Sequence, residues 1–501
     1  MSKSSSPAAE TPHNFMQRVL DAVEKVGNKV PHPVVIFVIL IGIVVVLSHV
    51  LHLFGSGVTY DAYNVETGEI EQNTLRARSL LTLEGIRFMF VSVVPNFMGF
   101  NAVGVIIVAM LGVGVAEEAG LVKALIRKLV IVSPRALLTY ILVFVGILSS
   151  IAADAGYLVL IPLAGVAYAS VGRHPIAGLG AGFAAVASAF TVNIVPKPLD
   201  GILTEITNDA IALAEPDKSI DLMANFWFSV GSVVVLTVLI ALITDRIIEP
   251  RLGKYGGGNS EAAESLTPEE RRGLKFALLG LVGVIAFFAL LTLPPGAPLR
   301  NAETGAILGN SPLMSGLIVV ITIVFLVCGA AYGFGAGTMK NSTDIINAMT
   351  KAVAGLAGLL FLLFVISQFI ALFNYSHMAT IAAVKLADIL TGANLDALWL
   401  LLGFIVVVFA LDLIITGAIP KWAIFAPLFV PLLMRLNVDP EAVLAAYRVG
   451  DSPMNSITPL NAYFALVVTF CQKYQKDAGV GTVVALMLIL LSVFLMPICI
   501  G

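Results

Sequence analysis

The sequence predicts an all-α polytopic membrane protein with nine transmembrane helices, two re-entrant hairpins and an inverted repeat whose broken helices meet at the membrane midplane. Of the 501 residues, 58% are hydrophobic and 12% charged, against about a quarter charged in soluble domains. Apolar runs of about 20 residues, the length that crosses a bilayer, recur along the chain. Several are interrupted by prolines and charges, which membranes tolerate only where the backbone faces protein or water.

The hydropathy pattern divides the chain into six segments. A polar N-terminal segment and two transmembrane helices come first, and two copies of a longer unit follow, separated by a loop and three helices. The predicted segments are the cytoplasmic N-terminal segment (1–32), the first two transmembrane helices (33–118), repeat 1 (119–248), a cytoplasmic loop (249–273), three transmembrane helices (274–374) and repeat 2 (377–501).

The first apolar run, 33–54, is predicted to be a retained transmembrane helix. It is too long for the core of a signal peptide, and no small-residue cleavage site follows it. The polar residues 55–80 are predicted to form a loop. The next run, 83–118, is too long for one span and is interrupted near Pro95 and Gly99.

Each repeat is predicted to contain a connector helix, a hairpin, a broken helix and a plain helix. In the first hairpin each arm has about 15 residues and would span roughly 23 Å, short of the ~30 Å hydrocarbon core, so the segment enters and leaves on one side. The first broken helix would be about 55 Å long if continuous, and Asn193 to Asp200 marks its break. The elements are connector 119–133, hairpin 134–172, broken helix 177–213 and plain helix 225–248 in repeat 1, and connector 377–392, hairpin 395–436, broken helix 441–472 and plain helix 481–499 in repeat 2.

Sliding the chain by 265 residues relates the two repeats, because it brings Pro175 onto Pro440 and Tyr157 onto Trp422. Basic residues place the loop 249–273, and with it the N-terminus, in the cytoplasm, and they put the two hairpins on opposite faces. Inverted repeats with broken helices are typical of secondary transporters.

Polar side chains gather at the two hairpin tips and the two helix breaks. Free carbonyls with carboxylates and hydroxyls suit a hard cation such as sodium, and helix N-termini suit an anion. The candidate substrate-binding residues are Asn193, Asp200, Trp422, Arg448 and Asp451. The candidate ion-coupling residues are Ser150, Asp154, Asn193, Asp451, Asn455 and Thr458, with Asp154, Asn193 and Asp451 as oxygen ligands for Na+.

The charged and aromatic candidates also have purely structural interpretations. Arg448 and Asp451 lie three residues apart on a helix, where they would pair with each other. Asp154 would cap a helix, Asp200 would lie at the outer membrane interface, and Trp422 would belong to the aromatic belt at the interface. Lys197 and Lys421 would either snorkel to the membrane surface or neutralise an anionic substrate. Asp412, on an arm of the second hairpin, would have either a structural or a functional role.

The function classes that remain are few. The sequence has no nucleotide-binding domain and none of the Ser-His-Asp, His-Glu-x-x-His or Gly-x-x-x-x-Gly-Lys patterns, so transport would be driven by a sodium or proton gradient with no other cofactor. A channel would need a continuous polar pore, whereas these groups cluster at the midplane. An intramembrane enzyme would use a dyad such as Asp200 and Asp451. No basic cluster suits nucleic acid, and the expected partners are a small substrate and membrane lipid.

Four motifs carry a family resemblance. They are Ser149-Ser150-Ile151-Ala152-Ala153-Asp154-Ala155-Gly156-Tyr157, Asn193-Ile194-Val195-Pro196-Lys197-Pro198-Leu199-Asp200, Gly417-Ala418-Ile419-Pro420-Lys421-Trp422 and Tyr447-Arg448-Val449-Gly450-Asp451-Ser452-Pro453. With these motifs the chain resembles the aminobenzoyl-glutamate transporter (AbgT) family over essentially its whole length.

The resemblance implies a homodimer in the bacterial inner membrane, with nine helices and two hairpins per subunit and an architecture related to sodium/dicarboxylate symporters. It also implies p-aminobenzoyl-glutamate uptake or proton-driven export of sulfonamide antimetabolites. The transport route that it implies is lined by Asp200, Trp422, Pro440, Arg448 and Asp451.

We therefore expect an ion-coupled secondary transporter for a small aromatic anion. Arg448 would hold the carboxylate or sulfonamide of the substrate and Trp422 would stack on its ring, while Asp200 and Asp451 would couple the ion. The alternative is a sodium-coupled dicarboxylate symporter, which the aromatic residues Tyr157 and Trp422 fit less well.

Overall fold

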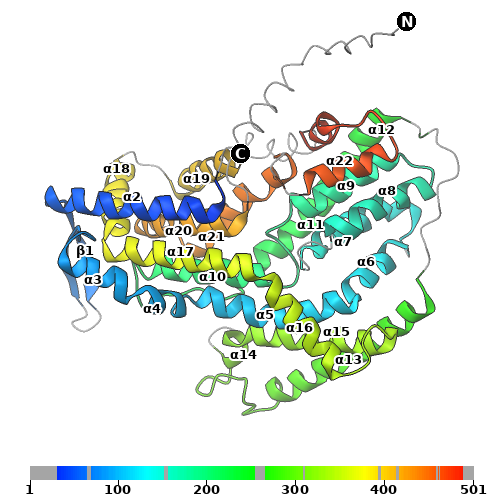
Figure 1. Cartoon of the computed structure of the whole chain (residues 1–501), viewed down its shortest axis with the longest axis horizontal. Coiled ribbons are helices and arrows are strands. Elements are labelled where there is room, and N and C mark those ends of the chain that lie inside the picture. The colour runs from blue at the N-terminus through cyan, green and yellow to red at the C-terminus, as the bar shows by residue number, and fades with distance from the viewer. Residues whose placement is uncertain are drawn as a thin grey trace, which may run out of the picture.

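The protein is a bundle of helices with one small β-hairpin (Figure 1). The computed structural model describes residues 31–64, 69–131, 133–151, 156–253, 255, 266–307, 311–392, 396–412, 417–458, 461 and 463–488. Within this part of the chain, seven helices are long and apolar enough to cross a membrane. The prediction of a polytopic helical membrane protein is confirmed at this level.

The β-hairpin corrects both the all-α class and the predicted loop at 55–80. Strands β1 (Gly57–Asn64) and β2 (Glu69–Arg76) are antiparallel, with Gly57 opposite Arg76. They include Thr59, Tyr60, Tyr63, Ile70 and Thr74, which are residue types that favour strands. Hydropathy could not reveal them, because a short hairpin with many polar residues contains no apolar run.

Helices α2 to α5 pack with helices α13 to α17 from the middle of the chain. The elements are α2 (Pro33–Leu53), α3 (Leu83–Val91), α4 (Val93–Met98), α5 (Asn101–Ala119), α13 (Pro268–Thr292), α14 (Pro312–Ser315), α15 (Leu317–Ala336), α16 (Ser342–Gly355) and α17 (Ala357–Tyr375). Helices α5 and α15 approach closely through small residues, and a Cβ at Gly329 would lie 2.6 Å from Ala116 Cα. The interruptions expected near Pro95 and Gly99 are the junctions around α4.

The segment predicted as repeat 1 consists of short helices around a break. The elements are α6 (Leu121–Ile131), η1 (Arg135–Leu137), α7 (Leu138–Ser149), η2 (Gly156–Leu160), α8 (Ile161–Ser170), α9 (Pro175–Ala187), α10 (Pro198–Ile211), α11 (Phe226–Ile243), η3 (Thr244–Ile248) and α12 (Glu249–Leu252). Pro198 occupies the first turn of α10, where its missing N–H costs nothing. Residues 188–197 between α9 and α10 form the first break.

The segment predicted as repeat 2 has its own break after Asp451. The elements are α18 (Met378–Gly392), α19 (Ala397–Asp412), α20 (Ala418–Arg435), α21 (Pro440–Asp451), η4 (Pro453–Ser456) and α22 (Phe464–Gln472), and residues 480–488 are also helical. Helix α20 already begins at Ala418, so Lys421 and Trp422 lie within a helix and not at the predicted tip. Pro420 marks a helix start, because proline is tolerated in a first turn, and Gly417 at φ 94° makes the preceding turn.

Two large apolar cores meet at the two breaks. One contains residues of α7, α8, α9, α11 and α22, and the other contains residues of α2, α10, α17, α20 and α21. Each broken helix therefore has one half in each core: α9 and α22 belong to the first, and α10 and α21 to the second. The unpaired backbone groups at the breaks consequently lie at the boundary between the cores, where Figure 1 shows α10, α11 and α21 converging.

Candidate functional site

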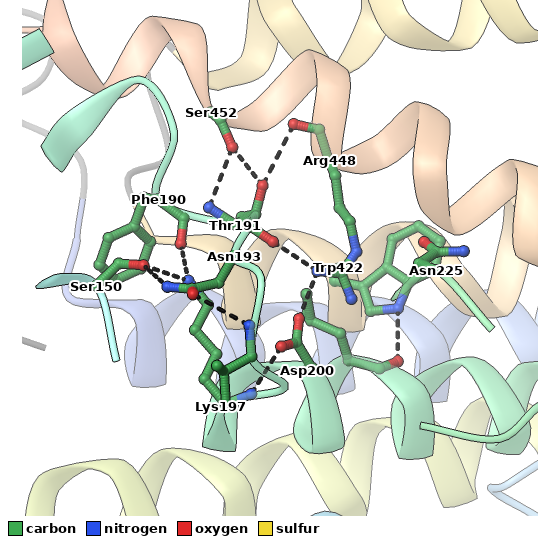
Figure 2. Close-up of polar contacts among 12 residues, drawn as sticks. Ser150, Phe190, Thr191, Asn193, Lys197, Asp200, Asn225, Trp422, Arg448 and Ser452 are labelled. Carbon is green, nitrogen blue, oxygen red and sulfur yellow. Dashed lines mark hydrogen bonds and ion pairs between the residues drawn. The ribbon is translucent and has the colours of Figure 1, made fainter. Parts of the chain in front are cut away.

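A buried ion pair joins the two broken helices. Arg448 of α21 places its Nη1 atom 2.5 Å from Asp200 Oδ1 of α10, and the same nitrogen donates to the Thr191 carbonyl at 2.5 Å (Figure 2). Asp200 in turn accepts the backbone N–H of Lys197 at 2.9 Å, which caps the start of α10. Only 3% of Arg448 and 9% of Asp200 are exposed, so this is a charge-assisted contact shielded from water.

The first break is also tied to the C-terminal end of α7. Asn193 Nδ2 donates to Ser150 Oγ at 3.1 Å and to the Ile147 carbonyl at 3.2 Å. The Lys197 ammonium donates to Ser150 Oγ at 2.9 Å and to the Phe190 carbonyl. Figure 2 shows these side chains gathered beside the Arg448–Asp200 pair. Polar groups at the break are thus held largely by a carbonyl and a hydroxyl at the end of α7.

A second ionic cluster lies between α19, α20 and α21. The Lys421 ammonium contacts Asp412 and is 2.6 Å from Asp451 Oδ1, and all three side chains are fully buried. Tyr447 Oη lies 3.1 Å from Asp451 Oδ1, and Asn455 Nδ2 donates to Asp451 Oδ2 at 3.4 Å. Arg448 and Asp451 therefore belong to different ionic networks on the same helix.

Arg448 also faces two cavities. The larger one, of about 440 Å³, is a mainly apolar groove between α11 and α21, with Phe228 and Trp227 on its α11 wall and Arg448 and Ser452 on its α21 wall. The smaller one is polar and brings Asp200, Asn225 and Arg448 together. Asn225 Oδ1 and Arg448 Nε are buried without a hydrogen-bond partner among the described residues. An apolar groove with a guanidinium at its edge suits a ligand with a ring and an anionic group.

A family model described as the "AbgT putative transporter family" matches residues 18–500. The chain belongs to the AbgT family of transporters. It is 34% identical to the p-aminobenzoyl-glutamate transport protein of Escherichia coli (strain K12) over 93% of this chain and 90% of that protein.

Two solved structures of transporters share the fold. The Alcanivorax borkumensis YdaH transporter superposes with a TM-score of 0.85 at 41% identity, covering 93% of this chain and 98% of that one. Neisseria gonorrhoeae MtrF, from a class of antimetabolite efflux pumps, superposes with a TM-score of 0.90 at 37% identity, covering 96% of each chain. AbgT membership thus places the chain among transporters and not among enzymes.

Several of the purely structural interpretations do not hold in this AbgT-family fold. Arg448 pairs with Asp200 and Asp451 with Lys421, so Arg448 and Asp451 do not neutralise each other. Asp200 is buried and does not lie at an interface, and Lys197 and Lys421 are each 1% exposed, which rules out snorkelling. Because Asp200 and Asp451 have separate cationic partners, they form no shared-proton dyad.

Trp422 and Pro440 lie away from both cavities of this transporter. The Trp422 ring is fully buried 4.5 Å from Tyr447, and its indole N–H donates to Thr207 Oγ1 at 3.0 Å. Pro440 is buried in the first turn of α21, as expected of a helix-starting proline. In this conformation the aromatic surface beside Arg448 is that of Phe228 and Trp227.

The predicted ion-coupling residues fall into separate groups. Ser150 and Asn193 belong to the hairpin network, whereas Asp451 and Asn455 belong to the Lys421 cluster. Thr458 is fully buried at the end of the second break, and Asp154 lies outside the described residues. No group of three or more His, Cys, Asp and Glu side chains able to hold a metal ion is found within the described part of the chain.

Sequence reasoning missed two residues of the site, Thr191 and Asn225, and left the role of a third, Asp412, open. Thr191 binds Arg448 through its carbonyl and contacts Ser452, but an uncharged threonine carries no signal. Asn225 donates to the Glu441 carbonyl at 3.0 Å and looks in sequence like an ordinary helix-start residue. Asp412 did carry a signal, because a lone carboxylate in an otherwise apolar helical arm is costly unless it has a partner.

Proposed function

We propose that this AbgT-family protein is an ion-gradient-driven secondary transporter of small aromatic anions in the bacterial inner membrane. Its substrates would be p-aminobenzoyl-glutamate, taken up, or sulfonamide antimetabolites, exported. Support comes from two relatives, a p-aminobenzoyl-glutamate transport protein and a member of a class of antimetabolite efflux pumps. Both directions use the same site, and the gradient decides which one dominates.

The Arg448–Asp200 pair is the observation that carries this proposal. It lies at both helix breaks and at the edge of the apolar groove. A guanidinium presents several donors in a fixed fork and binds carboxylates strongly. In this structure the Asp200 carboxylate is bound to the Arg448 guanidinium. The anionic group of an arriving substrate would displace this carboxylate and bind the guanidinium in its place.

The groove supplies the contact for the aromatic ring in this conformation. Phe228 lines it close to Arg448, and Trp227 lies at its rim with 80% of its surface exposed. Trp422 acts on the site through Tyr447. The two rings pack together, and Tyr447 is the residue directly before Arg448 on α21. Relative movement of α20 and α21 would change the position of Arg448 and Trp422 together.

The proposed architecture has nine spanning helices, two re-entrant hairpins and a cytoplasmic N-terminus, in a homodimer. The two helical arms Arg135–Ser149 and Gly156–Ser170 have about 15 residues each, and at 1.5 Å per residue each reaches roughly 23 Å. Neither crosses a ~30 Å hydrocarbon core, which supports the first hairpin. Helices α19 and α20 are longer, with 16 and 18 residues.

Flux in proteoliposomes tests the function. Purified protein is reconstituted, and uptake of labelled p-aminobenzoyl-glutamate, a sulfonamide and succinate is measured with sodium and proton gradients imposed separately. We expect saturable flux of the aromatic anions that Arg448→Ala abolishes, while Arg251→Ala, at an exposed position of α12, leaves it unchanged. Succinate flux driven by sodium would instead identify a dicarboxylate symporter, and normal flux through Arg448→Ala would refute the site.

A further inference from the structure

The ionic cluster of Asp412, Lys421 and Asp451 has a charge that its surroundings do not balance. Each of the three residues comes from a different helix, and none has exposed side-chain surface. One ammonium faces two carboxylates, so the cluster has a net charge of −1 when all three groups are ionised. One ammonium balances only one of the two carboxylates, which leaves a buried negative charge without a cation.

The hydrogen-bond pattern also leaves room for a proton. Asp412 Oδ2 is buried without a hydrogen-bond partner among the described residues. The Tyr447 hydroxyl has one hydrogen but two acceptors within reach, the Ala418 carbonyl at 2.5 Å and Asp451 Oδ1 at 3.1 Å. A proton on a carboxyl group of the cluster satisfies a position that protein donors leave open.

We propose that Asp412, Lys421 and Asp451 form the proton-binding site of this transporter, with one proton shared between the two carboxylates and Lys421 in the position of a metal cation. This rests on the proposed function and deepens it by naming the coupling ion and a residue, Asp412, that carries it. Sodium fits poorly, because the Lys421 ammonium already lies against both carboxylates.

Among the described residues, the charged groups that contact the cluster come from three helices. Helix α19 supplies Asp412, α20 supplies Lys421, and α21 supplies Asp451 and Tyr447. Arg448, one turn before Asp451 on α21, is engaged with Asp200. The substrate-binding cation and the proton-binding carboxylate therefore lie on the same rigid helix, three residues apart.

This arrangement couples the two events mechanically. Loss of the proton leaves a net charge in a dry site, which favours separation of α19 from α21 and entry of water. Because Gly450 has no side chain, α19 and α21 can pack closely in the present conformation. A Cβ at this position would lie 2.8 Å from Val408 Cβ. When α21 moves, Arg448 moves with it, and its contacts with Asp200 and with the substrate change together.

The test separates coupling from substrate binding. Wild-type protein, Asp412→Asn and the control Asp396→Asn, an exposed position just before α19, are reconstituted and loaded with unlabelled p-aminobenzoyl-glutamate. We expect Asp412→Asn to keep substrate counterflow within about twofold of wild type and to lose accumulation driven by a pH gradient. Asp412→Glu, which keeps a carboxylate, should retain accumulation with a shifted pH profile, and Asp396→Asn should behave as wild type.

Three results would overturn the proposal. The first is proton-driven accumulation by Asp412→Asn that equals that of the wild type. The second is wild-type accumulation that follows a sodium gradient alone. The third is that both Asp412→Asn and Asp412→Glu lose accumulation while their counterflow stays normal. Absence of counterflow in the wild-type protein would instead refute the proposed function. If Asp412→Asn does not fold, infrared spectra of the wild type decide: a protonated-carboxyl band must vanish on alkalinisation, and its absence contradicts the site.

Discussion

Replacing Asp200 with asparagine should make the transporter bind its anionic substrate more tightly. In the structure Asp200 holds Arg448 at 2.5 Å, so the substrate must displace a carboxylate before it can reach the guanidinium. Asparagine has nearly the same shape and keeps an oxygen that can accept the Lys197 N–H at the start of α10. The substitution therefore removes the competing charge with little disturbance of the helix.

The magnitude follows from the contact that is lost. A hydrogen bond to a charged group contributes about 1.5 to 3 kcal/mol, and each 1.4 kcal/mol is about a tenfold change in affinity. Asp200→Asn should thus lower the Kd for p-aminobenzoyl-glutamate by about tenfold to a hundredfold, whereas Arg448→Ala should abolish binding. Transport should fall in both variants, because Asp200 can no longer reclaim Arg448 and release the substrate.

Equilibrium binding of labelled substrate to detergent-purified protein measures this directly. Asp209→Asn is a matched control, because it changes a carboxylate on the same helix α10 that lies in neither of the two cavities beside Arg448. Weaker binding by Asp200→Asn would show that Asp200 contacts the substrate itself and does not compete with it. That outcome would refute the exchange of partners at Arg448.

Other predictions concern packing around the two networks. Gly450→Ala would place a Cβ 2.8 Å from Val408 Cβ, and overpacking of this kind costs about 1 to 3 kcal/mol of stability. The apparent Tm should therefore fall, and adding Val408→Ala to this variant should restore part of the loss. Trp422→Phe removes the indole hydrogen bond to Thr207, worth about 1 kcal/mol, and should lower the Tm with little change in Kd. Phe228→Ala should weaken substrate binding about tenfold, because the substrate loses apolar contact area. Its Tm should stay near that of wild type, because Phe228 lines the open groove.

Much of the fold follows from local patterns in the sequence. Apolar runs predicted the helices, and Pro196, Pro198 and Pro453 predicted where two of them break, because proline removes a backbone donor wherever it stands. The β-hairpin at 57–76 escaped, since its signal is alternation over a few residues and not hydropathy. The start of α20 was misplaced because Pro420 can mark either a break or a first turn, and only the backbone around Gly417 distinguishes them.

The candidate site was predicted in its residues but not in its pairing. Arg448, Asp200 and Asp451 stood out because a charge inside an apolar segment needs a reason to be there, and this holds for a single sequence position. Spacing on α21 allowed pairing of Arg448 with Asp451, but Arg448 binds a carboxylate 248 residues away. The sequence by itself thus determined which groups are buried and charged. The tertiary structure decided which of them meet, because ionic contacts depend on distances of a few ångströms between helices that chain spacing does not constrain.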